Sequence, residues 1–368
     1  MTRERVTAVT GMLLPLLVVA GGWLVWHHPE WPADFKSFWA ASRLVLQGRA
    51  AAVYDPVAEL LAQGVAPGQQ GMAFFYPPTF LLIVWPFGLL PFGWAMPVWL
   101  GVTLALWLVS LRVVMPLEFR SWVLPVVAMP AVWLNLAAGQ NGFLTAALLN
   151  LAVGWGERFP VAAGVCLGCL GYKPQFAFVL PVALVALGRW RVVAVSAVTA
   201  AAMVGASVWV FGAAAWRGFL AQPAGIDEVL RTGSEAPGKM VSLLGVLMAG
   251  HAPAWVGYGA QVVLSLVVCG LVWVFVRRGP GVVALVSVGS VLASPWLHRY
   301  DLVLLVPAAG WIASASRALV WERPVLVGLY WLPLATAMMG TGARFPLDIL
   351  GVALLMVLVP RRLGLGTD

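Results

Sequence analysis

Four short stretches of this chain carry polar side chains whose types suit proton transfer and anion binding. Asp34 supplies a carboxylate that can accept a proton, and the amides of Gln140 and Asn141 can donate hydrogen bonds to hydroxyl groups and accept them. Lys173 and Arg299 are cations, which hold phosphate groups through charge-assisted hydrogen bonds. Together these residues predict a site where a carboxylate takes a proton from a hydroxyl while two cations stabilise a phosphate.

Four further residues complete the candidate site. Tyr76, in the run F-F-Y-P-P, and His298, in the run S-P-W-L-H-R-Y-D, are expected to contact the substrates, as are the two amides. Asp301 and Arg43 are expected to support these groups. The chain has four His and scattered carboxylates with no metal-ligand spacing, so no metal is expected.

Each candidate also has a purely structural interpretation. Asp34 is a residue type that caps helix N-termini, and Lys173 can extend to the membrane interface while its stem stays in lipid. Arg299 and Asp301 are close enough in sequence to pair with each other, which would leave no free cation. His298 lies near a helix start, and the two adjacent amides can join helices by hydrogen bonds. The sequence leaves both sets of roles open.

The composition decides what kind of scaffold must position these residues. Of the 368 residues, 62% are hydrophobic and 10% are charged, and the mean hydropathy is +0.93. An ordinary soluble domain has roughly 45–50% apolar and about 25% charged residues. A soluble enzyme, a disordered chain and a disulfide scaffold are therefore excluded, and the sequence predicts an all-α polytopic membrane protein.

The net charge of +8 is distributed in a way that indicates membrane topology rather than nucleic-acid binding. Arginines gather at the ends of apolar segments, as at Arg158, Arg189 and Arg277, and no basic run is interleaved with aromatic residues. Cytoplasmic loops of membrane proteins are enriched in Lys and Arg. We therefore expect the bilayer, and no nucleic acid, as a partner.

Segments of about 20 apolar residues predict the membrane spans. Residues 6–26 form the first; it follows Arg3 and Arg5, which puts the N-terminus in the cytoplasm, and it lacks a cleavage site, so we expect it to be retained. Further apolar segments lie near residues 95–111, 122–138, 141–155, 160–172, 175–188, 192–211, 255–276, 282–296, 301–316, 325–339 and 346–360. This pattern gives about twelve spans with both termini in the cytoplasm.

Two segments are expected to be irregular. Residues 76–90 are short and rich in proline, and counting them as a full span spoils the sorting of the arginines, so they predict a broken or re-entrant helix. Residues 35–47 predict an amphipathic helix lying on the outer surface. The chain is expected to form one integral membrane domain over residues 1–368, with a first span (1–26), an extracytoplasmic loop (27–75), core spans (76–211), a second extracytoplasmic loop (212–254) and C-terminal spans (255–368).

One cysteine pair has the spacing of a metal or redox motif. Cys166 and Cys169 form C-x-x-C, but they lie inside an apolar segment without partner ligands. Gly164 and Gly168 overlap this pair and form G-x-x-x-G, a pattern that lets helices approach closely. The sequence therefore predicts helix packing here.

Five blocks, in this order, resemble the polyprenol-phosphate-mannose-dependent α-1,2-mannosyltransferases of glycosyltransferase family 87, in the membrane glycosyltransferase C superfamily. The blocks are D-F-K-S-F-W-A-A-S-R-L-V-L-Q-G-R-A-A-A-V-Y-D-P, F-F-Y-P-P-T-F-L-L-I-V-W-P-F-G-L-L-P, A-G-Q-N, Y-K-P followed by R-W-R, and S-P-W-L-H-R-Y-D-L. They span residues 34 to about 302. One departure is that His298 is followed by Arg299, where the family pattern has two histidines.

The resemblance implies a bundle of the glycosyltransferase C type and an inverting transfer of a sugar, with mannose expected. It implies a polyprenyl-phosphate donor, a glycolipid or glycan acceptor, no metal and no cofactor. In such enzymes an Asp in the first extracytoplasmic loop is the general base, and Asp34 matches it. The protein is then expected in the bacterial plasma (inner) membrane, with an extracytoplasmic active site.

A transporter or flippase of lipid-linked sugars is the alternative function. Transporters show internal repeats and a midplane site on broken helices. The segment at residues 76–90 favours this alternative, while the lack of a repeat and the position of the polar residues at one face oppose it.

Overall fold

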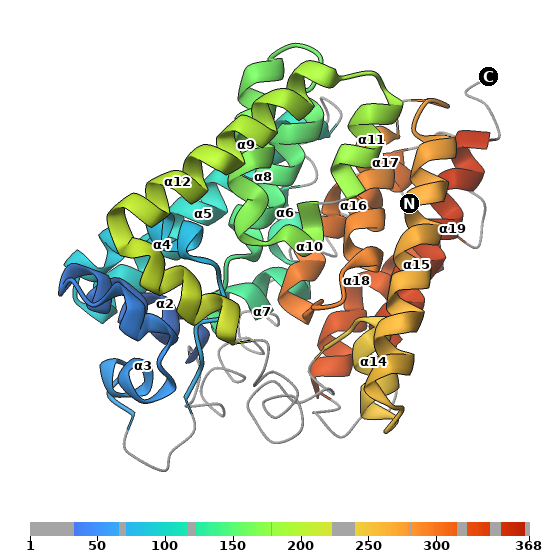
Figure 1. Ribbon diagram of the computed structural model, residues 1–368. Helices are drawn as coiled ribbons and strands as arrows, with labels where there is room; N and C mark the ends of the chain where they lie inside the picture. The colour runs from blue at the N-terminus through green and yellow to red at the C-terminus, as the bar shows by residue number, and fades with distance from the viewer. Residues whose placement is uncertain are drawn as a thin grey trace.

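The computed structural model describes residues 33–65, 71–115, 123–177, 179–222, 240–279, 281–314, 322–338 and 347–364. The predicted first span at residues 6–26 lies outside the described residues, as does the stretch 223–239 of the predicted second loop. The described residues form helices and no strand, apart from one bridge between Met240 and His298. The all-α prediction is confirmed for this part of the chain (Figure 1).

The helices follow the predicted apolar segments closely. They are α2 (Ala33–Leu46), the 3₁₀ helix η1 (Ala50–Tyr54), α3 (Pro56–Ala62), α4 (Pro78–Val84), η2 (Trp85–Leu89), α5 (Phe92–Val114), α6 (Val123–Val127), α7 (Pro130–Ala138), α8 (Gly142–Gly154), α9 (Pro160–Cys169), η4 (Leu170–Tyr172), α10 (Pro174–Ala177), α11 (Val179–Ala186), α12 (Trp190–Ala221), α14 (Leu243–Ala249), α15 (Ala254–Phe275), α16 (Val282–Ala293), η6 (Arg299–Leu305), α17 (Val306–Ser314), α18 (Glu322–Met338) and α19 (Leu347–Gly364). Several of them, including α3, α4, α7 and α9, begin at a proline, which suits the first helical position because its missing N–H would be unpaired there.

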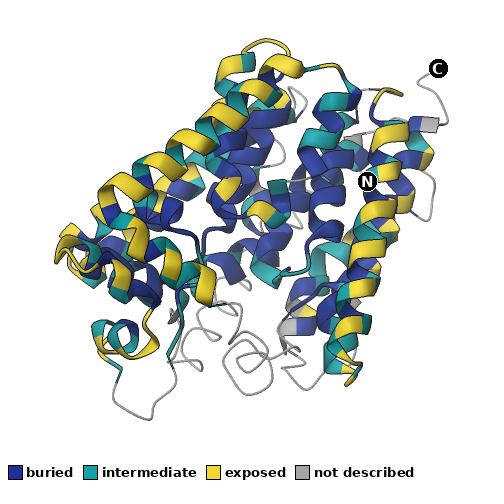
Figure 2. Ribbon diagram, in the orientation of Figure 1, coloured by how far each residue is buried: buried dark blue, intermediate teal, exposed yellow. Residues whose placement is uncertain are grey.

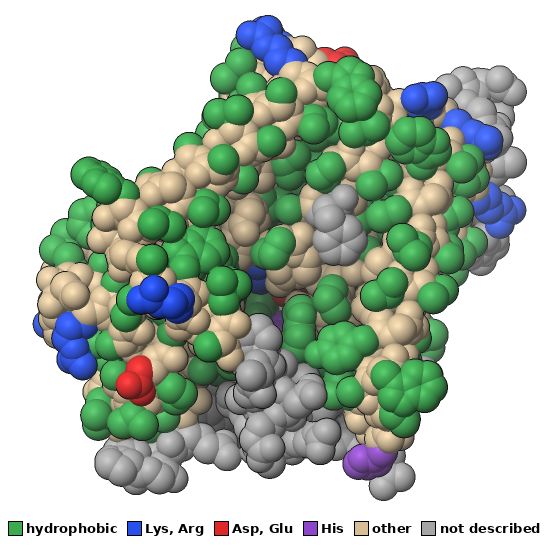
Figure 3. All heavy atoms as spheres, viewed as in Figure 1, with side chains coloured by type: hydrophobic (Ala, Val, Ile, Leu, Met, Phe, Trp, Pro, Cys, Tyr) green, Lys and Arg blue, Asp and Glu red, His purple; other side chains and the backbone are tan. Residues whose placement is uncertain are grey.

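Three of the described helices are long and apolar enough to cross a bilayer: α5, α12 and α15. Several others, such as α8 and α16, are apolar but shorter. Figure 2 shows α8 and α16 buried inside the bundle, with exposed residues along α12 and α15. The exposed positions of α12 and α15 are largely apolar, as at Val198, Trp209 and Leu266, and hydrophobic side chains cover the middle of this face in Figure 3. Such a surface is expected of an integral membrane protein.

Side-chain contacts gather the helix ends into two groups, at opposite ends of the bundle. At one end, here called the opposite end, Arg189 pairs with Glu157 and so joins the turn after α11 to the turn after α8. Arg277, after α15, donates to the carbonyl of Ala186 at the end of α11. Arg362 near the end of α19 pairs with Glu322 at the start of α18.

The other group of helix ends is called the site end, because the candidate site residues lie there. Lys173, after η4, meets Asp301 in η6, and Arg299 in η6 meets Asp348 at the start of α19. The end of α12 joins them, since Gln222 donates to the carbonyl of Phe74 at 3.0 Å. Helices α8, α9, α11 and α12 therefore run in alternating directions.

The predicted G-x-x-x-G packing is found between α9 and α12. A methyl group added at Gly164 would lie 2.6 Å from Cβ of Val195, and one at Gly168 would lie 2.5 Å from Cβ of Thr199. The thiols of Cys166 and Cys169 are free. The two glycines therefore allow the close approach of the backbones of α9 and α12.

The two segments expected to be irregular differ in outcome. Residues 76–90 contain α4 followed by η2, and both pack on α2, since Ser42 donates to the carbonyl of Val84 and its backbone abuts Gly88. Helix α2 forms within one or two residues of its predicted bounds, but only a small part of it lies on the surface, as at Arg43 and Leu46. Phe35 and Phe38 are 1% exposed, so most of α2 is packed inside the protein.

Helix α12 extends ten residues past the predicted segment end at 211, into the region predicted to be a loop. It is interrupted at Gly212, whose φ of 80° is readily adopted by glycine, and Figure 1 shows the helix changing direction there. Residues 243–249 of the same predicted loop form α14. The break lets an apolar helix continue at a new angle toward the site end.

Candidate active site

Asp34 is joined to the amide of Gln140, although 106 residues separate them in sequence. Nε2 of Gln140 donates to Oδ2 of Asp34 at 2.9 Å. On the other side of the amide, the Tyr76 hydroxyl donates to Oε1 of Gln140 at 3.2 Å. Three sequence-predicted residues, from three separate stretches, therefore form one hydrogen-bonded chain.

Aromatic packing holds α2, and with it Asp34, against this series of hydrogen-bonded side chains. The ring of Phe38 meets those of Tyr76 and Phe80, with centroids 5.4 and 5.2 Å apart. Phe80 in turn stacks on Tyr172 at 4.7 Å. Edge-to-face and stacked rings are specific contacts, and they fix the position of α2 relative to α4 and η4.

The turn between α7 and α8 presents Gln140. Helix α7 ends at Gly139, whose φ of 69° lies in the left-handed region, and a Cβ there would lie 2.6 Å from Cβ of Phe35. A Cβ at Gly142 would lie 2.9 Å from the carbonyl oxygen of Tyr300. The two glycines thus let this turn touch both the Asp34 stretch and the stretch that carries Asp301.

Asn135 of α7 supports the same turn and was missed by sequence reasoning. It is fully buried, and its amide, oriented to satisfy its surroundings, donates to the carbonyl of Gln140 at 2.9 Å and accepts from the N–H of Phe143 at 3.0 Å. Its position one turn before the A-G-Q-N-G run was the available signal.

The side chain of Asn141 is buried beside the Tyr76 hydroxyl. Among the described residues, neither its Oδ1 nor its Nδ2 completes a hydrogen bond of ordinary geometry. Buried amides are normally paired, so these two atoms are available to pair with a polar group of a substrate.

Lys173 and Asp301 form a buried ion pair. Nζ of Lys173 lies 2.7 Å from Oδ1 of Asp301, and the two side chains are 4% and 0% exposed. The ammonium also lies 5.3 Å from the ring centre of Phe176 and 5.2 Å from that of Tyr300. The pair is therefore enclosed by aromatic faces that favour a cation.

His298 stands at the N-terminus of η6. Its backbone N–H donates to Oδ2 of Asp301 at 3.4 Å, and its ring stacks on that of Tyr300 at 5.2 Å. The bridge to Met240 ties the same residue to the segment before α14. His298 is thus held within the cluster by structural contacts.

Arg299 pairs with Asp348 and not with Asp301. Its Nε donates to Oδ2 of Asp348 at 3.3 Å and to Oγ1 of Thr336 at 3.1 Å. The alternative in which Arg299 and Asp301 pair with each other is therefore wrong. Asp348 was not recognised from the sequence, where its signal was a lone carboxylate within the apolar segment 346–360.

Arg43 is not brought to this cluster. It is exposed, its guanidinium contacts the carbonyl of Gly88 at 3.4 Å, and it lies 5.8 Å from the ring centre of Trp39. It therefore fastens α2 to η2.

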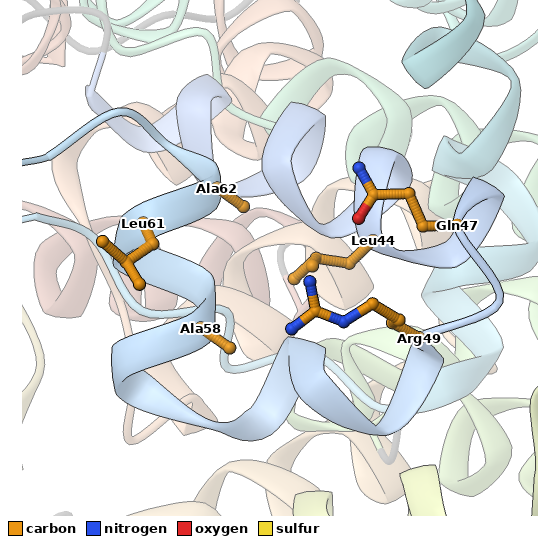
Figure 4. Close-up of a pocket in the computed structure, with 6 residues that line it drawn as sticks. All are labelled: Leu44, Gln47, Arg49, Ala58, Leu61 and Ala62. Carbon is orange, nitrogen blue, oxygen red and sulfur yellow. The ribbon is translucent and has the colours of Figure 1, made fainter.

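A cavity of about 230 Å³ lies between the end of α2 and α3 (Figure 4). It contains none of the predicted site residues. Its lining consists of Leu44, Gln47, Arg49, Ala58, Leu61 and Ala62.

The cluster combines the groups needed for proton transfer next to an anion. A carboxylate, two amides, a tyrosine hydroxyl and a lysine lie together at one end of an apolar bundle. Basic, acidic and histidine side chains are visible in the recess near the centre of the view in Figure 3.

Searches of curated protein sequences and of solved structures gave no significant match. The model of glycosyltransferase family 87 matches residues 74–295, a stretch that contains Tyr76, Gln140, Asn141 and Lys173. This match covers more than half of the chain. The chain therefore belongs to glycosyltransferase family 87, and by that membership it is a glycosyltransferase.

Proposed function

We propose that this glycosyltransferase moves a sugar, mannose, from a polyprenyl-phosphate donor to a hydroxyl of a glycolipid or glycan acceptor, with Asp34 as the general base. The observation that carries the proposal is the 2.9 Å hydrogen bond between Gln140 and Asp34. It joins a carboxylate of the first loop to the polar cluster within the family-matched stretch. The family match supports the sugar transfer, and the resemblance of the five sequence blocks supports the donor.

The reaction is a single displacement. The acceptor oxygen attacks the anomeric carbon while its O–H bond breaks and the proton passes to the Asp34 carboxylate. The bond between the anomeric carbon and the phosphate oxygen breaks, and its electron pair leaves with the polyprenyl phosphate. The configuration at the anomeric carbon is inverted. General-base assistance of this kind contributes roughly 10²–10⁴-fold.

Lys173 and Arg299 stabilise the phosphate as it leaves. An ammonium carries three N–H donors, and the bond to Asp301 uses one of them. Arg299 is anchored through Nε, while a guanidinium donates from its Nη groups as well. Asn141, Tyr76 and His298 contact the sugar and the acceptor, and Asp301 keeps Lys173 in place.

The site end lies on the extracytoplasmic side and the opposite end in the cytoplasm, within about twelve spans and with both chain termini cytoplasmic. The basic residues at the opposite end, including Arg189, Arg277 and Arg362, support this orientation. Two single-cysteine variants test the orientation, Arg158→Cys and Asp55→Cys, each with the native cysteines replaced by alanine. In intact cells an impermeant thiol reagent should label Asp55→Cys and leave Arg158→Cys unlabelled. Labelling of Arg158→Cys but not of Asp55→Cys would reverse the orientation.

The test of the reaction uses purified protein in detergent with labelled polyprenyl-phosphate mannose and candidate acceptors. A new glycosidic bond is expected, and Asp34→Asn should lower its rate of formation by roughly 10²–10⁴-fold. Asp55→Asn is the matched control: Asp55 caps α3 in the same loop through bonds to the N–H groups of Val57 and Ala58, and asparagine caps equally well. Wild-type activity of Asp34→Asn would overturn the assignment of the base.

The alternative, a flippase of lipid-linked sugars, is favoured by the interrupted helices at residues 76–90. In sealed vesicles a flippase moves the labelled sugar lipid between leaflets and forms no new bond. Movement without a product would therefore favour this second function.

A further inference from the structure

The amide of Gln140 is held in one orientation. Its Oε1 accepts two hydrogen bonds, from the Tyr76 hydroxyl and from the backbone N–H of Asn141, both at 3.2 Å. An amide rotated by 180° would turn its NH₂ toward these two donors and its oxygen toward the carboxylate of Asp34. The two donors therefore fix which end of Gln140 faces Asp34.

This arrangement leaves the Gln140 amide committed to protein partners. The residue is 6% exposed, and its backbone is held by Asn135 through a further hydrogen bond to the Gln140 carbonyl. With its oxygen and one N–H already bonded, Gln140 is better suited to hold Oδ2 of Asp34 than to recognise a sugar.

The neighbouring amide has the opposite character. Asn141 is completely buried, yet its Oδ1 and Nδ2 complete no hydrogen bond of ordinary geometry among the described residues. It lies beside the Tyr76 hydroxyl, at the N-terminus of α8. Burying an amide without hydrogen-bond partners costs free energy. A substrate group that pairs with this amide would therefore bind favourably.

We propose that the two adjacent amides have different roles in the site. Gln140 is a positioning residue that orients the Asp34 carboxylate, and Asn141 is the specificity-determining residue that pairs with two neighbouring hydroxyls of a hexose ring. One hydroxyl donates to Oδ1 and the other accepts from Nδ2, because a carboxamide offers one acceptor and a pair of donors. The inference rests on the proposed function, in which Asp34 is the base.

The first test is a double-mutant cycle between Gln140 and Asp34. Gln140→Ala should lower kcat by about tenfold or more, a part of the roughly 10²–10⁴-fold that a general base contributes, while the KM values for donor and acceptor stay within about twofold. In an Asp34→Asn background the same change should cost less than about twofold, because Gln140 acts only through Asp34.

The second test uses monodeoxy analogues of the sugar donor and of the acceptor. The wild-type enzyme should discriminate against the analogue that lacks a hydroxyl paired with Asn141. Asn141→Ala should raise the KM for the intact substrate by about tenfold or more. It should then use the intact substrate and this analogue equally well. Asn150→Ala is the matched control, because Asn150 is another buried amide of α8 that pairs with Ser110 outside the cluster. It should alter thermal stability without altering analogue preference.

The outcomes separate the proposals. If Gln140→Ala raises KM and leaves kcat unchanged, or if its effect persists undiminished in Asp34→Asn, Gln140 is not a positioning residue. If Asn141→Ala keeps the wild-type preference among analogues, Asn141 does not recognise hydroxyls. Wild-type activity of Asp34→Asn itself would refute the proposed base, and binding of the deoxy analogues would still test Asn141.

Discussion

The Nζ atom of Lys173 lies 2.7 Å from Oδ1 of Asp301, and the two side chains are 4% and 0% exposed. The pair joins the turn after η4 to η6 across 128 residues of sequence. Each charge is nearly fully removed from solvent, so each depends on the other. The arrangement holds a cation beside the Asp34 cluster without leaving it uncompensated.

Breaking this pair from one side should destabilise the protein strongly. Removing one partner of a buried ion pair typically costs about 3–5 kcal/mol, because the remaining charge is left without compensation. We expect Asp301→Asn and Lys173→Met each to lower the thermal unfolding midpoint in detergent. The double variant should recover much of the loss, since the pair is then replaced by neutral groups.

Activity separates the two roles of the pair. The double variant should fold but transfer sugar poorly, because the cation that stabilises the leaving phosphate is gone. A double variant no more stable than the single ones would show that the two charges do not compensate each other.

The contact between α9 and α12 gives a second prediction. Gly168→Val should lower the unfolding midpoint, because its side chain would meet Cβ of Thr199 at 2.5 Å and the carbonyl of Ser196 at 2.8 Å. Overpacking typically costs about 1–3 kcal/mol. Gly205→Val is the matched control, since a Cβ at Gly205 of α12 has no atom within 4 Å. Equal effects of the two substitutions would argue against close packing at Gly168.

The helices were predictable from the sequence because their signal is local. A run of apolar residues bounded by proline, glycine and arginine, as in α15 or α16, must form a helix wherever backbone groups are removed from water. The ends of α5 and α15 fall within three residues of the predicted segments. The continuation of α12 beyond 211 was missed, because Gly212 interrupts the helix and permits a change of direction instead of ending it.

The partners of the polar residues were not predictable, because pairing depends on which helix ends meet in space. Arg299 and Asp301 are two residues apart, yet each pairs with a residue from a distant segment. Nothing in the spacing distinguishes Asp348 from a solvated carboxylate. Likewise, Gln140 and Tyr76 could be recognised as polar residues near helix ends, but their bond across 64 residues could not.

Glu59 should make the stability of the first loop depend on pH. Burial raises the pKa of Glu59 to about 8 from its usual 4.5, opposed in part by its hydrogen bond from Gln63. Between these two pH values the folded protein holds a proton that the unfolded chain has released, so stability falls as pH rises, at most by about 1.4 kcal/mol per pH unit. The decline should begin near the unfolded value and end near the folded one.

Glu59→Gln should remove this dependence, because glutamine keeps the shape of the side chain and does not titrate. Unfolding midpoints measured across this range should then change less with pH in Glu59→Gln than in the wild type. Glu157→Gln, which alters an exposed carboxylate at the opposite end, should keep the wild-type slope. A slope that survives in Glu59→Gln would assign the dependence to another group.

The pair of Arg299 and Asp348 gives the last prediction, which concerns donor binding. If Arg299 contacts the donor phosphate, Asp348 and Thr336 determine where its guanidinium lies, since both bond to Nε. Arg299→Ala should therefore raise the KM for the donor, and Asp348→Asn should raise it by a smaller factor with little change in the acceptor KM. Loss of a hydrogen bond to a charged group is worth about 1.5–3 kcal/mol, which sets an upper range of roughly 10- to 150-fold.

Helices α18 and α19 carry a matched control at their other end. Glu322 and Arg362 form an ion pair between the same two helices, far from the candidate site. Glu322→Gln should lower the unfolding midpoint and leave the donor KM unchanged, because it weakens the packing of the helices without moving Arg299. If Glu322→Gln and Asp348→Asn changed the donor KM equally, the effect would come from the packing of α18 on α19. Kinetics of all three variants, measured at a temperature well below their unfolding midpoints, therefore distinguish the anchoring of one guanidinium from the general stability of the C-terminal helices.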